Sequence, residues 1–187
     1  MINNLSFNED ETRYEKAKDV FLFSCFTGLR HSDLFKLRRS NIKGEFLVIT
    51  SQKTEDSIRV PLTDQAKAIL EKYKDSGDIN PIPVISQQKY NQYLKHIGFK
   101  AELFEMVTQI HYKGRERIET TLPKWQLLTT HIGRKTFVTL AVFLDIPLET
   151  VAKITGHKSD AIEAYYRILD SKKAIEMQKF NNLKIAK

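Results

Sequence analysis

The chain has 187 residues, of which 41% are hydrophobic and 28% are charged, as in an ordinary globular domain with a sizeable core. Its 30 Lys and Arg residues outnumber its 23 Asp and Glu residues, so the net charge is +7 and the pI is about 9.4. An excess of this size favours a polyanionic partner, with nucleic acid ahead of a membrane surface.

Cysteine usage and hydropathy exclude several other classes. Cys25 is the only cysteine, which excludes an internal disulfide and a cysteine-rich zinc site and fits a reducing cytoplasm. The first residues, MINNLSFNEDETRYEK, are polar and acidic, unlike a signal peptide. No apolar run reaches the roughly 20 residues that a membrane-spanning helix needs, so we expect no membrane partner.

The N-terminal segment predicts two helices. The first covers residues 5–26, where apolar residues recur at helical spacing. Ser6 and Glu9 have the spacing of a capping box at its start, and Gly28 is placed to cap its end. A second, short helix is expected over residues 31–39.

A small hairpin and a third helix follow. Residues 45–50 (EFLVIT) and 58–63 (IRVPLT) predict two antiparallel strands, joined by the polar turn SQKTEDS at 51–57. Thr63 is a suitable N-cap for a helix over residues 63–76. This hairpin is the one small sheet that the sequence predicts.

The second half of the chain is predicted to be largely helical. Segment 107–129 reads as irregular or hairpin-like, with a basic centre. Pro147 is placed as a first helical residue and Gly156 as a helix cap. Further helices are expected over residues 86–103, 132–144, 147–155 and 160–167, followed by a basic tail. The predicted fold class is therefore mainly α (α+β), with a small antiparallel sheet.

Polar residues suited to phosphate chemistry are spread along the chain. Each alone also fits an ordinary role, such as a local ion pair, a solvated charge, a helix cap or a core ring. His131 and Arg134, in TTHIGRKTF, lie three residues apart and share one helix face, where an imidazole beside a fixed cation suits an anionic phosphate. The complete set is Arg30, Asp33, Lys53, His131, Arg134, His157, Tyr165 and Tyr166.

Four segments, FTGLRHSDL, KT…IRVPL, TTHIGRKTF and ITGHKS…YYRI, together resemble the tyrosine recombinase (phage integrase) family. The resemblance runs from about Phe26 to Asp170, and TTHIGRKTF most resembles integrases of Bacteroidetes-type mobile elements. A count of nine residues from His157 places the family's nucleophile at Tyr166 rather than Tyr165. The family's catalytic pattern maps onto Arg30, Lys53, His131, Arg134, His157 and Tyr166, with Asp33 as the supporting acidic residue.

The resemblance implies site-specific DNA recombination or integration by a tyrosine recombinase. Tyr166 would attack the scissile phosphate to form a 3′-phosphotyrosyl link and a free 5′-hydroxyl, and a 5′-hydroxyl of another strand would reverse the step. Arg30 and Arg134 would clamp the non-bridging oxygens, with a further hydrogen bond from His157.

The remaining residues would move protons or position other groups. His131 would accept or help to transfer the proton of Tyr166, and Lys53 would protonate the leaving 5′-oxygen. Asp33 would orient Arg30 or a neighbouring histidine without touching the substrate. No metal ion or cofactor is expected, because the arginines and the lysine supply the positive charge that a two-metal site would provide.

The implied partner is double-stranded DNA. KLRR, HYKGRER and the basic tail would meet backbone phosphates, which set affinity and its salt dependence. The resemblance further implies a homotetramer on paired recombination sites in the full-length protein, in the nucleoid-associated part of a bacterial cytoplasm. Residues 1–187 are expected to form a single C-terminal catalytic domain, with the N-terminal core-binding domain absent from this chain.

Three alternatives stay open at this point. Residues 146–167 have the look of a helix-turn-helix, which would bind DNA without catalysis and would leave the candidate residues before it without a purpose. A type IB topoisomerase would share the tyrosine chemistry and relax supercoils. A catalytically inactive integrase remnant would only bind DNA.

Overall fold

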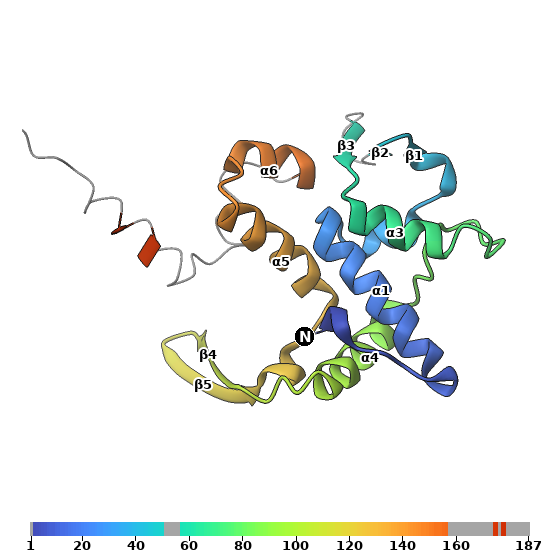
Figure 1. Cartoon of the computed structure of the whole chain (residues 1–187). Helices are drawn as coiled ribbons and strands as arrows, with labels where there is room; N and C mark the ends of the chain where they lie inside the picture. Colours follow the sequence, from blue (N-terminus) through green and yellow to red (C-terminus); the bar gives the residue numbers. More distant parts are fainter. Residues whose placement is uncertain (1, 51–56, 157–173, 176, 179–187) are drawn as a thin grey trace, which may run out of the picture.

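The computed structural model of the chain describes residues 2–50, 57–156, 174–175 and 177–178. Helix α1 (Thr12–Thr27) lies at its centre and packs against α3 (Asp64–Lys72), α4 (Gln87–Lys100) and α5 (Thr130–Phe143) (Figure 1). Short antiparallel sheets accompany the helices. The predicted mainly α fold is confirmed.

Helix α1 is buried on most of its sides because three helices surround it. It ends where Gly28 takes a left-handed conformation, with φ of 70°, and the Gly28 N–H donates to the Ser24 carbonyl at 2.9 Å. The predicted cap at Gly28 is thereby confirmed. The predicted capping box of Ser6 and Glu9 is wrong, because α1 is preceded by a 3-10 turn in which the Asn8 N–H donates to the Glu11 carboxylate.

The predicted hairpin is present and gains a third strand. Strands β1 (Ile42–Lys43), β2 (Phe46–Thr50) and β3 (Ser57–Pro61) form an antiparallel sheet in that order. Leu47 of β2 pairs with Val60 of β3, and both side chains are buried, which fixes the register. Helix α3 then begins at the predicted cap, because the Thr63 side chain accepts a hydrogen bond from the Ala66 N–H.

Helices α5 and α6 (Leu148–Thr155) enclose a small core of their own, formed by Val138, Ala141, Val151 and Ala152. Helix α6 also packs on β3. It ends at Gly156, with φ of 65°, as predicted, and it begins one residue after Pro147, which is its N-cap. The predicted helix over 160–167 lies outside the described residues, as does most of the basic tail.

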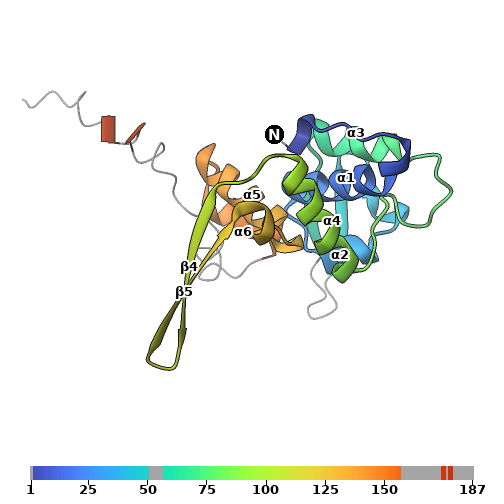
Figure 2. The ribbon, with the colours of Figure 1, turned by 90° about the horizontal axis from the view of Figure 1, so that it is seen from below.

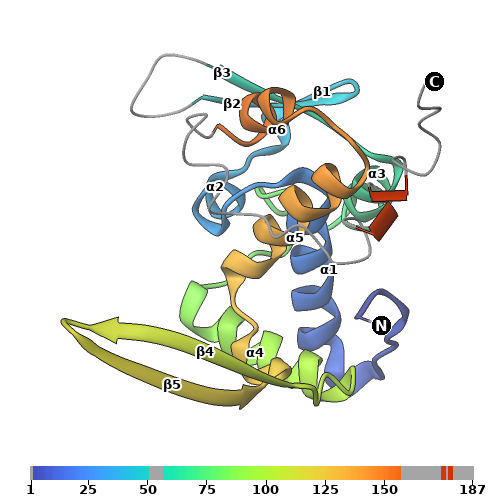
Figure 3. The same cartoon turned by 90° about the vertical axis from the view of Figure 1, so that its left-hand side faces the viewer.

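The segment predicted as irregular or hairpin-like forms an antiparallel hairpin, which is a second sheet. Strands β4 (Met106–Lys113) and β5 (Glu116–Pro123) form a long ribbon, which we call the β4–β5 ribbon, followed by the 3-10 helix η4 (Lys124–Leu127). Figures 2 and 3 show that it projects from the helical body on the side on which α2 (His31–Lys36) lies. Polar residues occupy both of its faces, so the sequence lacks the alternation typical of a half-buried strand.

Within the described residues, no helix combines the length and the apolar character that crossing a bilayer requires.

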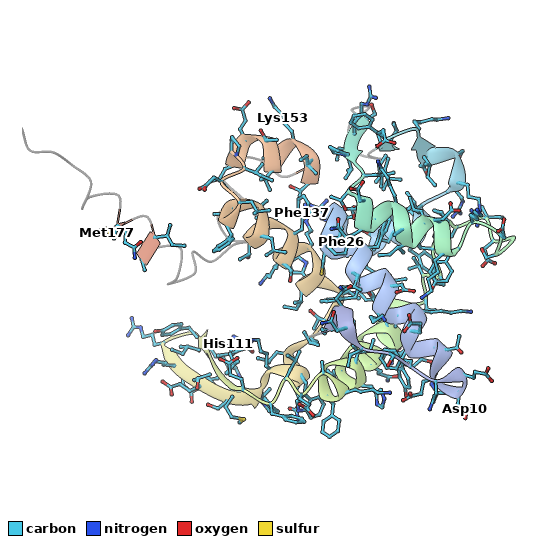
Figure 4. The ribbon with its side chains drawn as sticks, viewed as in Figure 1. Asp10, Phe26, His111, Phe137, Lys153 and Met177 are labelled. Atoms are coloured by element: carbon cyan, nitrogen blue, oxygen red, sulfur yellow. The ribbon has the colours of Figure 1, made fainter. Side chains whose placement is uncertain are left out.

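At Gly28 the helices α1, α5 and α6 lie close together. A Cβ atom built on it would lie 2.6 Å from Cδ1 of Phe137 on α5 and 2.9 Å from Cγ2 of Thr155 on α6. Figure 4 shows Phe26 and Phe137 where α1 and α5 meet. Only glycine therefore satisfies both the positive φ and the available space.

We expect Gly28→Ala to lower the free energy of unfolding by about 3 kcal/mol, because left-handed strain and overpacking add together. Gly44→Ala is the matched control, since Gly44 also has a positive φ, of 57°, but nothing lies within 4 Å of the position that its added methyl group would take. The free energy of unfolding of this control should fall by about 1 kcal/mol. Urea denaturation of both variants measures the difference, and equal losses would show that the close approach is unimportant.

Candidate active site

The N-terminal ends of α2, α4 and α5 lie next to one another. His31, the first residue of α2, donates from Nε2 to the Ile85 carbonyl at 2.9 Å, just before α4. Gln87, the first residue of α4, donates to Oγ1 of Thr130 at 3.3 Å, and Asn91 accepts from the Thr130 N–H at 2.9 Å. Because helix N-termini carry partial positive charge, this side of the molecule is favourable for an anion.

Arg30 stands at this side as the N-cap residue of α2, with an extended backbone and an exposed side chain. The carboxylate of Asp33 accepts a hydrogen bond from the Arg30 backbone N–H at 3.3 Å. The Asp33 N–H in turn donates to the Arg30 carbonyl at 3.0 Å. Asp33 therefore fixes the backbone from which the Arg30 guanidinium extends, which is a physical route to the orienting role expected of it.

Arg134 is 1% exposed and is the largest fully buried side chain among the described residues. Its Nη1 donates to the Gly28 carbonyl and its Nη2 to the Thr155 carbonyl, each at 2.7 Å. These carbonyls lie at the C-terminal ends of α1 and α6, where the helix dipole leaves partial negative charge. Whereas the sequence led us to expect an open fork for phosphate oxygens, both terminal nitrogens of Arg134 here bind protein carbonyls and join three helices.

His131 lies in the first turn of α5 and is surrounded by positive charge. Partial burial, and then the charges of Lys135, Arg134 and Arg30, lower the pKa of His131 below its ordinary value of 6.5. The imidazole is therefore neutral at neutral pH and is able to accept a proton. The structure thus brings Arg30, His131 and Arg134 into one cationic cluster, which we call the Arg-His cluster.

Sequence reasoning missed several residues that build this cluster. Lys135 contributes positive charge next to His131, and only its place beside Arg134 in the sequence could have pointed to it. Gln87 and Asn91 hold the start of α5 from a helix distant in the chain. No motif marks them, because their role depends on tertiary contacts.

The other candidates, Lys53, His157, Tyr165 and Tyr166, lie outside the described residues. Described residues close to segments 51–56 and 157–173 are neighbours. Gly156 fits so closely against Ile58, near the start of β3, that an added Cβ would lie 2.4 Å from the Ile58 Cδ1. Among the described residues, no group of three or more His, Cys, Asp or Glu side chains could hold a metal ion.

Removal of the Arg134 side chain should destabilise the fold strongly, because two buried carbonyls lose their donors. We expect Arg134→Ala to lower the free energy of unfolding by about 3 kcal/mol. Lys135→Ala removes a cation from the same helix at an exposed position and should change the free energy of unfolding by less than about 0.5 kcal/mol. Urea titrations followed by circular dichroism measure both values. Similar effects of the two variants would contradict a structural role for Arg134.

The lowered pKa of His131 predicts a specific pH dependence. In the folded chain, protonation of His131 should occur at a pH below 6.5, so its contribution lowers stability as the pH falls through the unfolded value. Lys135→Gln should raise the pKa, whereas Lys153→Gln, on α6, should leave it unchanged. Imidazole chemical shifts in an NMR titration report the value, and a wild-type pKa at or above 6.5 would refute the cationic surroundings.

Comparison with solved structures shows the same fold in several recombinases. The XerA recombinase matches with a TM-score of 0.63 and 16% identity, over 96% of this chain and 66% of that chain. XerH site-specific recombinase bound to a palindromic difH substrate matches with a TM-score of 0.65 and 14% identity, over 96% of this chain and 49% of that chain. The Tn1549 transposon integrase in complex with a circular intermediate DNA matches with a TM-score of 0.65 and 14% identity, over 95% of this chain and 62% of that chain.

This chain spans between about half and two thirds of the length of these structures. No curated protein matches it significantly in sequence. A family model described as the phage integrase family matches residues 2–173. That match covers nearly all of the 187 residues and reaches far beyond the segment that a helix-turn-helix alone would need. The chain therefore belongs to the phage integrase family.

Proposed function

We propose that this chain cleaves and rejoins DNA strands in site-specific recombination, through a 3′-phosphotyrosyl intermediate. The observation that carries the proposal is the Arg-His cluster, which lies at the N-terminal ends of helices in a chain of the phage integrase family. Arg30 and Arg134 reach it from segments that are more than 100 residues apart. A cluster of this kind suits a phosphodiester, whose charge grows in the transition state.

In this proposal the cluster stabilises the scissile phosphate in two ways. The exposed guanidinium of Arg30 binds non-bridging oxygens directly, as a planar fork suited to phosphate. Arg134 supplies a second positive charge from a buried position, where electrostatic interactions are stronger than in water. The N–H groups that begin α5 add to this field. His157 donates a further hydrogen bond.

The proton transfers follow from the same surroundings. The Tyr166 oxygen forms a bond to phosphorus while the bond from phosphorus to the 5′-oxygen breaks. The neutral imidazole of His131 takes the tyrosine proton, and the Lys53 ammonium gives a proton to the leaving 5′-oxygen. Attack by a 5′-hydroxyl of another strand reverses these transfers and restores the phosphodiester, so no external energy source is needed.

The proposed partner is double-stranded DNA. Among the structural neighbours, XerH is bound to a difH substrate, and a lambda integrase dimer is bound to a COC′ core site. The lambda integrase structure matches with a TM-score of 0.57 and 21% identity, over 85% of this chain and 58% of that chain. The net charge of +7 suits such a partner. We propose that residues 1–187 act as the catalytic domain within a homotetramer on paired sites.

A helix-turn-helix protein without catalysis is less well supported. It would need only residues 146–167 and would give no reason for a cationic cluster around His131. A type IB topoisomerase would use the same chemistry, and the formation of recombinant products rather than relaxed supercoils separates the two activities.

Covalent capture of DNA tests the proposed chemistry. The wild-type protein, incubated with a suicide duplex nicked beside the cleavage point, should form a protein–DNA adduct that survives a denaturing gel. Tyr166→Phe should abolish the adduct, because phenylalanine lacks the attacking oxygen. The measurement is the fraction of labelled DNA that is shifted to the mass of the adduct.

Tyr165→Phe is the matched control and should retain capture. If it is instead the inactive variant, the assignment of the nucleophile is wrong. A chelator in a parallel reaction should leave capture unchanged, and a requirement for magnesium would indicate different chemistry. Absence of any adduct with the wild-type protein would overturn the proposed function.

A further inference from the structure

The β4–β5 ribbon takes no part in the Arg-His cluster, yet most of its side chains are exposed. Its strands pair without interruption from Met106 opposite Pro123 to Lys113 opposite Glu116. Its main packing partner outside the ribbon is η4, at its base. Since a two-stranded hairpin is only marginally stable in water by itself, an exposed ribbon of this length is suited to a partner that covers it.

The two faces of the ribbon differ. The face toward the body carries Val107 and Leu122, which are partly buried near the base. On the opposite face the β4 side chains of Met106, Thr108, Ile110 and Tyr112 are all exposed. Met106, Ile110 and Tyr112 are 60%, 47% and 70% exposed. This outward face therefore offers apolar and aromatic side chains to a partner.

Positive charge gathers at the tip of the ribbon. Lys113 and Arg115 flank the turn at Gly114 and are exposed. Within residues 2–50 and 57–156, no carboxylate forms an ion pair with either of them, whereas Arg117 is paired with Glu119. The two unpaired cations thus stand at the end of the ribbon that is farthest from its base at η4.

The ribbon also lies on the relevant side of the molecule. In Figures 2 and 3 it extends past the helical body on the side of α2, whose N-cap is Arg30. Figure 4 places His111 out on the ribbon, away from the helices. Eight residues per strand give a length of about 26 Å, and the major groove of B-DNA, about 12 Å wide, admits a two-stranded ribbon.

We propose that the β4–β5 ribbon is a second DNA-binding surface, which lies along the duplex beside the cleavage point. Lys113 and Arg115 bind backbone phosphates, and the outward face carrying Ile110 and Tyr112 faces the groove. The proposal rests on the proposed function, because the Arg-His cluster defines where the duplex lies. Charge complementarity at the tip favours DNA over a second copy of this chain.

The salt dependence of DNA binding tests the tip. Binding of a fluorescein-labelled duplex of mixed sequence is measured by anisotropy at a series of salt concentrations, for the whole chain. Lys113→Ala/Arg115→Ala should reduce the slope of log K against log salt concentration by about 2, because two phosphate contacts are lost. The affinity near physiological salt should fall on the order of tenfold.

Lys67→Ala/Lys74→Ala is the matched control because it removes the same charge. Lys67 lies on α3 and Lys74 just after it, and Figure 3 shows α3 on the side of the body away from α2. The slope of log K against log salt concentration for this control should match that of the wild-type chain. An unchanged slope for the tip variant, or an equal fall for the control, would overturn the proposal. A tip variant that only loses DNA-independent self-association would identify a second copy as the partner.

A cysteine at the tip tests direct contact. Cys25 is buried, which raises its pKa to about 12, so it gives no competing reactive thiol. Glu116→Cys should form a disulfide by exchange with duplexes that carry a tethered pyridyl disulfide on one side of the cleavage point, with release of pyridinethione, and Lys74→Cys should not. No cross-link at any position would refute the ribbon's placement.

The two proposals fail separately. Wild-type capture together with an unchanged slope for the tip variant overturns only the ribbon surface. DNA binding that depends on the ribbon, without any covalent adduct, overturns only the strand-transfer chemistry. A wild-type chain that binds no duplex overturns both.

Discussion

The two hydrogen bonds of the Arg134 guanidinium determine how the rest of the site is arranged. They join α5 to the last carbonyls of α1 and α6, and so fix where the chain leaves Gly28 toward Arg30. A buried cation is costly unless it is fully engaged, and two carbonyls at negative helix ends engage it well. The first turn of α5, with His131, is held in place by the same anchor.

Local signals in the sequence identified most of the fold. Gly28, Thr63 and Gly156 were recognised as caps because capping depends on a few neighbouring residues. The pairing of His131 with Arg134 follows from their helical spacing, whereas the approach of Arg30 to them follows only from the family resemblance. The burial of Arg134 could not be predicted, since it depends on carbonyls distant in sequence. The length of the ribbon could not be predicted either, since polar residues occur on both of its faces.

The electrostatics change along α1. Near the middle of the helix, the buried Asp19 accepts hydrogen bonds from Lys72 and Tyr73, each at 2.6 Å, so carboxylate and ammonium compensate each other and tie α1 to α3. Burial, and then Asp19, raise the pKa of Tyr73, which keeps its phenol protonated as a donor. Beyond the C-terminal end of α1, positive groups gather around His131. A framework held by an ion pair thus supports a cationic site that is favourable for an anion.

The hydrogen bond from Arg134 to the Thr155 carbonyl couples the end of α6 to α5. Thr155 is the last residue of α6, and Gly156, which follows it, packs closely against Ile58 of β3. A shift of the C-terminal end of α6 would therefore move the carbonyl that Arg134 binds, and with it the helix that carries His131.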